Sequence, residues 1–204
     1  MPRFVLASAS PARLATLRRA GLDPEVIVSD VDESTVSAPS TADLVKTLAT
    51  VKARVVASRL DGDVVVLGCD SLLEFDGESF GKPGDAETAA QRWRKIRGKS
   101  GVLHTGHCLI RPGVFETART VATIVHFAPI SEDEIATYAA TGEPSEVAGA
   151  FTIDGLGGWF ISKIEGDPHN VVGVSLPVLR DMLREHRLTV MDLGYPATAD
   201  AGAD

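Results

Sequence analysis

The chain has 204 residues, 44% of them hydrophobic and 24% charged, which is typical of a globular protein with a sizeable core. Acidic residues outnumber basic ones by 28 to 20, and this net negative charge argues against broad nucleic-acid binding. The N-terminal apolar stretch is too short for a signal peptide, and no run approaches the ~20 apolar residues of a membrane span. We therefore expect a cytoplasmic protein without membrane contacts.

The first third of the chain predicts two strands and two helices. Residues 3–7 indicate a short buried strand, followed by a helix that Ser10 caps and Gly21 ends. Residues 25–28 suggest a second strand, and residues 41–59 form the clearest helix. The predicted inward stripe of that helix contains Leu44, Leu48, Val51 and Val55, with Lys52 inside the stripe.

The middle third begins with a near-continuous apolar run at residues 63–69, which is typical of a strand buried on both faces. The run leads directly into Asp70. Residues 85–97 predict a helix. Residues 101–110 and 116–127 predict a hairpin around a Pro112-Gly113 turn.

The last third opens with a capping box at residues 131–134, which predicts a helix that ends near Gly142. Residues 159–164 suggest a strand and residues 176–186 a final helix. No linker divides the chain, so we expect a single domain over residues 1–196 and a disordered acidic tail over 197–204. This mixture of strands and helices predicts an α/β fold with a mixed sheet.

Several side chains are suited to phosphate chemistry. Ser8, Ser10 and Arg13 lie where the first strand enters the first helix, a position that favours anions. Lys52 and Lys82 are compact positive charges of the kind that bind phosphate. Taken alone, each of these features is better explained by plain helix capping or by a lysine at the surface.

Two acidic positions are candidate ligands or bases. Asp70 follows a buried strand, where ligands of open α/β sheets bind, and a carboxylate there can hold a cation or accept a proton. A turn-capping role beside Ser71 explains Asp70 equally well. Asp32 and Glu33 offer oxygen ligands for magnesium, although a solvated acidic loop is the commoner case.

Other motifs are missing from the sequence. It contains no GxxxxGK[ST] loop, no GxSxG elbow and no CxxC pair. Cys69 and Cys108 are expected to be buried thiols. His104 and His107 fall on opposite faces of a predicted strand, so we do not expect them to share a metal.

Taken in order, these motifs resemble the Maf family. The match covers nearly the whole chain, from Phe4 to about Leu183. It rests on SxSPxR at residues 8–13, Asp32-Glu33, the lone Lys52, Asp70 after its strand, Gly81-Lys82-Pro83, Thr105-Gly106, residues 142–144, 148–151 and 170–173.

The resemblance implies a fold and an activity. Maf proteins are nucleoside-triphosphate pyrophosphatases, which cut between the α- and β-phosphates of ordinary or modified nucleotides and need Mg²⁺ or Mn²⁺. It implies a twisted mixed sheet flanked by helices, with two lobes around a central cleft, as in ITPase-like house-cleaning enzymes. At the level of the family it also implies a homodimer.

The resemblance assigns roles to residues of this chain. Asp70 is the expected proton acceptor, and Glu33 and Asp70 are the expected metal ligands. The expected phosphate-binding residues are Ser8, Ser10, Arg13, Lys52 and Lys82. Three positions distinguish the family's dTTP/UTP subgroup from its 7-methyl-GTP subgroup, and here they are Ala12, Ser71 and Asp154. These residues match neither subgroup. They therefore predict where base specificity is set, but they do not identify the base.

Two other functions stay open at this point. The chain could be a nucleotide-binding regulator of cell division with incidental hydrolysis, or a phosphatase that releases orthophosphate. Loss of Asp70 or of the lysines would favour the regulator, and neither is lost.

Overall fold

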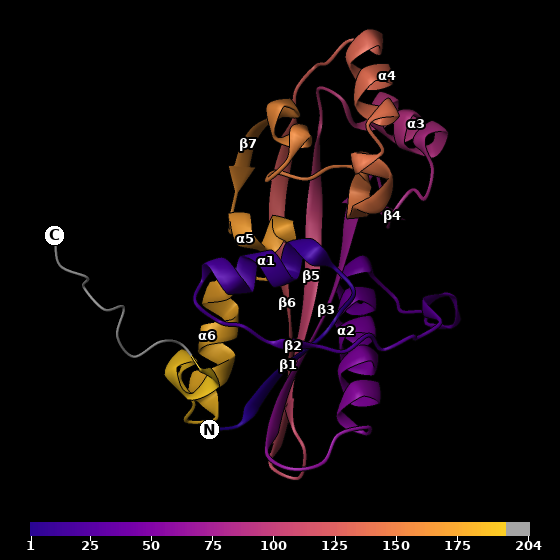
Figure 1. Ribbon diagram of the computed structural model, residues 1–204. Coiled ribbons are helices and arrows are strands. Elements are labelled where there is room, and N and C mark those ends of the chain that lie inside the picture. The colour runs from indigo at the N-terminus through magenta and orange to yellow at the C-terminus, as the bar shows by residue number, and fades with distance from the viewer. Residues whose placement is uncertain (195–204) are drawn as a thin grey trace, which may run out of the picture.

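The computed structural model describes residues 1–194, over which seven strands form one mixed sheet in the order β2-β1-β3-β5-β6-β7, with β4 beside β3 (Figure 1). β1 runs parallel to β2 and β3, and the other pairs are antiparallel. The predicted α/β class with a mixed sheet is confirmed. The strands are β1 (Arg3–Ala7), β2 (Glu25–Val26), β3 (Val64–Phe75), β4 (Glu78–Phe80), β5 (Ser100–Arg111), β6 (Phe115–Phe127) and β7 (Ile161–Glu165).

The helices begin where the sequence places polar caps. Ser10, Ser40 and Asp85 each accept a hydrogen bond from a backbone N–H of the first turn. The predicted capping box from Ser131 to Glu134 is confirmed. The α-helices are α1 (Pro11–Arg19), α2 (Thr41–Ala57), α3 (Ala86–Ile96), α4 (Glu132–Ala140), α5 (Pro168–Val172) and α6 (Leu176–Glu185). The short 3₁₀ helices are η1 (Glu33–Thr35), η2 (Glu143–Glu146), η3 (Ala148–Ala150), η4 (Leu156–Phe160) and η5 (Val190–Leu193).

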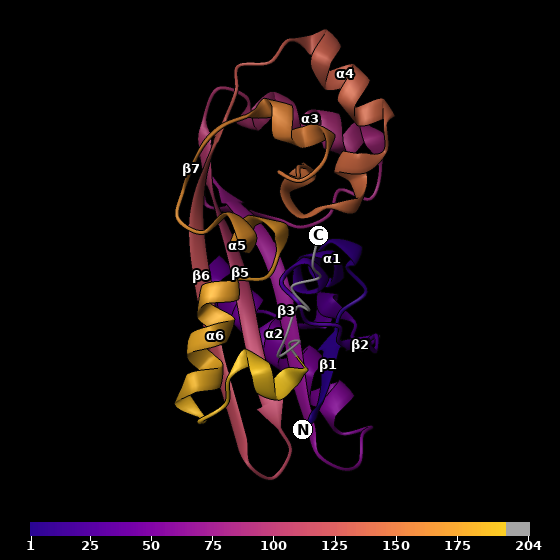
Figure 2. The ribbon, with the colours of Figure 1, turned by 60° about the vertical axis from the view of Figure 1, so that its left-hand side comes forward.

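The predicted two lobes are visible at the two ends of the long strands β3, β5 and β6 (Figures 1 and 2). In one lobe, Trp93 of α3 lies at the centre of the core and packs edge-to-face on Phe127, on Tyr138 of α4 and on Phe160 of η4. In the other lobe, α2 covers one face of the sheet, while α1 and α6 cover the opposite face. Alternate residues of β3 enter these two cores, as a strand with both faces buried requires.

The contact between α2 and the sheet corrects the predicted inward stripe. Only Leu48 of that stripe is fully buried, and the sheet-facing side instead carries Val45, Leu48, Ala49, Lys52, Ala53 and Val56. The cause is close backbone approach. A Cβ added to Gly68 would lie 2.3 Å from the Ala49 carbonyl oxygen, and one on Gly106 would lie 2.1 Å from that of Val45. Small residues at the contact therefore place Lys52 against β3.

The strand expected over residues 63–69 is longer in the structure, and Asp70 lies inside β3 rather than after it. The strand continues because β5 pairs with it without interruption from Val66 to Glu74. The partner along its other edge changes, since β1 pairs with β3 no further than Gly68 and the pairing of β3 with β4 begins only at Leu73. Asp70 thus lies where the parallel neighbour ends, beside an edge that carries no strand in the described residues.

Three further expectations have definite outcomes. Cys69 and Cys108 are buried and free, as predicted. Among residues 1–194, every helix is too short or too polar to cross a membrane. The predicted tail over 197–204 lies outside the described residues.

Candidate active site

A cleft of about 330 Å³ opens between the two lobes at the bare edge of β3. Its walls come from the β1–α1 junction, the segment that leads into η1, α2, β3, the β4–α3 loop, residues 146–152 and the end of α5. All but one of the predicted site residues line it: Ser8, Ser10, Ala12, Arg13, Glu33, Lys52, Asp70, Ser71 and Lys82. Asp154 is the exception.

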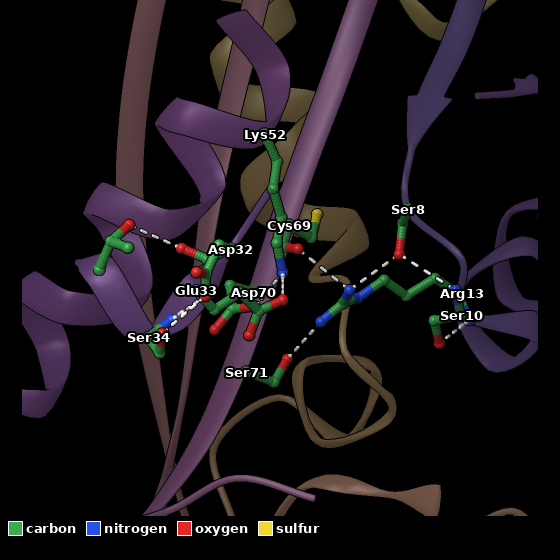
Figure 3. A network of polar contacts seen from close by, with 11 residues as sticks. Ser8, Ser10, Arg13, Asp32, Glu33, Ser34, Lys52, Cys69, Asp70 and Ser71 are labelled. Atoms are coloured by element: carbon green, nitrogen blue, oxygen red, sulfur yellow. Dashed lines mark hydrogen bonds and ion pairs between the residues drawn. The ribbon is translucent and has the colours of Figure 1, made fainter. Parts of the chain in front are cut away.

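Lys52 joins two carboxylates at the centre of the cleft (Figure 3). Its Nζ lies 2.5 Å from Asp70 Oδ1 and 2.6 Å from Glu33 Oε1. Lys52 and Asp70 are both buried, whereas Glu33 is exposed. Burial raises the pKa of the Asp70 carboxyl, although the charges of Lys52 and Arg13 favour its ionised form. The Asp70 carboxylate therefore has a higher proton affinity than an ordinary aspartate.

Arg13 extends from α1 across the floor of the cleft, and its guanidinium makes four hydrogen bonds, of which Figure 3 shows those to Ser8, Cys69 and Ser71. Its Nε donates to the Gly173 carbonyl at 2.9 Å, and Nη1 donates to Ser8 Oγ at 2.9 Å and to the Cys69 carbonyl at 3.0 Å. Nη2 donates to Ser71 Oγ at 3.0 Å. Because a guanidinium has five N–H groups, one N–H on Nη2 is left for another acceptor.

Residues behind Ser71 extend this network, and sequence reasoning assigned them no role of their own. Thr105 Oγ1 is 2.9 Å from Ser71 Oγ and donates to the Asn170 carbonyl at 3.0 Å. The Asn170 amide in turn bonds to Thr123 Oγ1 at 3.0 Å. Thr105, Asn170 and Gly173 all belong to motifs that carry the family resemblance, which was the available signal.

Lys82 and Ser10 occupy the outer part of the cleft. Lys82 is exposed and makes no ion pair within residues 1–194. Its loop is fixed because the Gly81 carbonyl accepts from Arg92 Nη1 at 2.5 Å and from the Gly149 N–H at 3.0 Å. Ser10 caps α1, because its Oγ accepts a hydrogen bond from the backbone N–H of Arg13 at 3.4 Å. Ser10 therefore caps the helix, as its simplest explanation predicts, and it also lines the cleft.

Asp154 lies in a neighbouring hollow of about 410 Å³ instead of the cleft. It pairs there with Arg19 Nη2 at 3.3 Å, beside Thr16 and His169. Val172 at the end of α5 lines both hollows, so the hollow that contains Asp154 adjoins the cleft there.

The charges that line the cleft bear on its need for a cation. Three cationic side chains (Arg13, Lys52 and Lys82) face four carboxylates (Asp30, Glu33, Asp70 and Glu146). A triphosphate would bring several more negative charges. No cluster of three or more histidines, cysteines or carboxylates forms a ready metal cage in the described chain. Two carboxylates on one side fit Mg²⁺, which usually takes one or two from the protein and completes its shell with phosphate and water.

His107 provides a test of the buried network by pH. This fully buried residue accepts a hydrogen bond from the Ser175 N–H at 2.8 Å through Nε2. Burial, with the charge of Arg13, lowers the pKa of the imidazole from 6.5 to about 4. Below about pH 6.5 the imidazole therefore binds a proton in the unfolded chain but stays neutral in the folded chain. The free energy of unfolding falls as the pH is lowered from about 6.5 toward the folded-state pKa of about 4.

We expect the free energy of unfolding to drop between pH 7.5 and pH 5 by about 2 kcal/mol more in the wild type than in His107→Gln. Urea unfolding at the two pH values measures this difference, with the variant correcting for the carboxylates that both proteins share. Equal drops in the two proteins would contradict a neutral buried imidazole.

The chain is similar to a described protein family and to several named proteins. The family model described as "Maf-like protein" matches residues 3–186. A protein of Salinispora tropica named "Nucleoside triphosphate pyrophosphatase" is 57% identical over 97% of this chain and 89% of its own length. A protein of Streptomyces coelicolor with the same name is 50% identical over 96% of each chain. The solved Ham1 protein of Staphylococcus aureus matches 62% of this chain and 72% of its own, with 16% identity and a TM-score of 0.44.

Proposed function

The chain belongs to the Maf family, and we propose that it is a nucleoside triphosphate pyrophosphatase that yields a nucleoside monophosphate and pyrophosphate. The relatives at 50–57% identity that bear this name support the activity. The observation that carries the proposal is the buried Asp70–Lys52 pair at the centre of a cleft that Arg13 and Lys82 also line.

Asp70 is the proposed proton acceptor. A water molecule beside its carboxylate gives up a proton to Asp70 while the water oxygen forms a bond to the α-phosphorus. The bond from the α-phosphorus to the bridging oxygen breaks, and pyrophosphate leaves with the electron pair. A carboxylate whose pKa is raised by burial is a better base than an ordinary one, which favours Asp70 for this step.

The cationic and hydroxyl groups of the cleft are proposed to hold the phosphates. Within residues 1–194, the second N–H of Arg13 Nη2 and the ammonium of Lys82 have no protein partner and are available as donors, and Ser8 and Ser10 add hydroxyls beside the start of α1. The positive charge of Lys52 favours the ionised form of Asp70 and so opposes the effect of burial on its pKa. Positioning and charge neutralisation are expected to supply most of the rate.

Glu33 and Asp70 are the residues that would hold Mg²⁺ or Mn²⁺. The bound cation would neutralise phosphate charge that the lining side chains leave uncompensated.

We therefore expect EDTA to stop pyrophosphate release and an excess of Mg²⁺ or Mn²⁺ to restore it. The measurement is coupled detection of pyrophosphate, with circular dichroism to show that the chelated protein stays folded. Full turnover in EDTA-treated, metal-free buffer would contradict the cation requirement.

Base specificity is proposed to depend on Ala12, Ser71 and Asp154. Ala12 leaves the cleft wall small, and Ser71 is already engaged by Arg13 and Thr105. Asp154 faces the adjoining hollow.

The test of the proposed function is product analysis with a panel of ordinary and modified nucleoside triphosphates. We expect monophosphate and pyrophosphate in equal amounts. Orthophosphate that appears without added inorganic pyrophosphatase would indicate a phosphatase. Nucleotide binding without turnover would indicate a regulator.

A further inference from the structure

A buried histidine lies behind Arg13, outside the cleft. His107 on β5 is fully buried, and the cleft lining does not include it. Its Nε2 accepts the Ser175 N–H at 2.8 Å, so the ring proton resides on Nδ1 and the imidazole is neutral. Ser175 is fully buried as well. Water cannot readily replace the imidazole, and losing the acceptor would leave a buried N–H without a partner.

Ser175 fixes the loop that contacts Arg13. It caps α6, since its Oγ accepts from the Val178 N–H at 3.3 Å. Two residues earlier, the Gly173 carbonyl accepts from Arg13 Nε at 2.9 Å. Gly173 has φ +113°, and a Cβ there would lie 2.9 Å from Arg13 Nε. The loop is thus in tight contact with the guanidinium, and any displacement of the loop is passed to it.

The direction of the remaining Arg13 donor depends on these contacts. The bond to Gly173 holds one side of the planar fork, while Ser8, Cys69 and Ser71 hold the other. Releasing Nε removes one of the four restraints on the planar guanidinium and leaves its orientation to the bonds of Nη1 and Nη2. The free N–H on Nη2 then loses its fixed direction toward the cleft.

We propose that His107 is a positioning residue which, by holding the Ser175 N–H, fixes the Gly173 carbonyl and so aims Arg13 at the phosphates of the substrate. The inference rests on the proposed function, in which Arg13 contacts those phosphates. It assigns a part in the reaction to a residue of β5 that never touches the substrate.

The test compares two amide replacements of the same polarity. The Gln side chain in His107→Gln reaches far enough to put an oxygen near the Nε2 position, whereas the Asn side chain in His107→Asn is one methylene shorter. We expect His107→Asn to lower kcat for pyrophosphate release by about 10- to 100-fold, with a smaller change in KM. His107→Gln should stay within about threefold of the wild type, because it restores the acceptor. Equal kcat values for the two variants overturn the proposal.

A double-mutant cycle shows whether His107 acts through Arg13. Arg13→Lys keeps a positive charge but loses the planar fork. In that background, His107→Asn should cost less than about twofold in kcat, since the group that it aims is gone. An undiminished loss in the Arg13→Lys protein overturns the proposal.

A matched control separates positioning from stability. Leu109 is a fully buried residue two positions along β5, in the core that α6 also enters. Leu109→Ala should lower the melting temperature yet keep kcat near the wild-type value at temperatures where it is folded. A loss of kcat in Leu109→Ala equal to that in His107→Asn makes the effect one of stability and overturns the positioning role.

Wild-type protein that releases no pyrophosphate in the same assay refutes the proposed function itself. An active wild type with an equally active His107→Asn refutes only the role of His107.

Discussion

Replacing Asp70 by asparagine is expected to lower kcat for pyrophosphate release by about 10³-fold. The amide keeps the shape of the side chain and can still accept from Lys52, but it cannot take a proton from water. Initial rates with a saturating nucleoside triphosphate and Mg²⁺ measure the effect.

The fold of Asp70→Asn should remain intact, because the amide oxygen can still accept from Lys52 and Glu33 still supplies that lysine with a counter-charge. Thermal unfolding checks this point. Asp63→Asn is the matched control, since Asp63 is a surface residue that pairs with Arg111 away from the cleft. Turnover near the wild-type rate in Asp70→Asn would show that Asp70 is not the proton acceptor.

Replacing Gly106 by alanine is expected to destabilise the protein by at least about 3 kcal/mol. The added Cβ would lie 2.1 Å from the Val45 carbonyl oxygen and 2.6 Å from the Lys46 nitrogen. Both are backbone atoms of α2, so relief requires the whole helix to move away from the sheet. Lys52 on α2 would move with it, and kcat should fall as well.

Differential scanning calorimetry measures the loss in Gly106→Ala, expected as a drop in melting temperature of roughly 6–12 °C. Gly81→Ala is the stability control, because a Cβ there meets only Leu72 Cδ2, at 3.4 Å. A Gly106→Ala protein with the wild-type melting temperature would show that α2 does not lie as close to β5 as the structure has it.

Elements with local signals could be predicted from the sequence. Ser10 with Pro11 and the box at Ser131 marked helix starts because capping chemistry involves residues a few positions apart. The inward face of α2 could not be found in this way. It follows from Gly68 and Gly106, whose contacts with the helix join residues far apart in the sequence. The length of β3 likewise depends on pairing with β5, which no local pattern reveals.

The cleft residues could be predicted because the family resemblance preserves their order along the chain. Their support could not, since it is long-range. Arg13 bonds to Gly173, 160 residues away, and His107 accepts from Ser175, 68 residues away. The placement of Asp154 in the neighbouring hollow depends on the path of the loop after η3, which the sequence does not specify.

Hydrolysis in ¹⁸O-labelled water tests the central claim most directly. If water activated beside Asp70 attacks the α-phosphorus, mass spectrometry will find one ¹⁸O atom in the nucleoside monophosphate and none in the pyrophosphate. Label in pyrophosphate would mean attack at the β-phosphorus, and labelled orthophosphate with a nucleoside diphosphate would mean attack at the γ-phosphorus. Either result contradicts the assignment of this cleft to cleavage at the α-phosphorus.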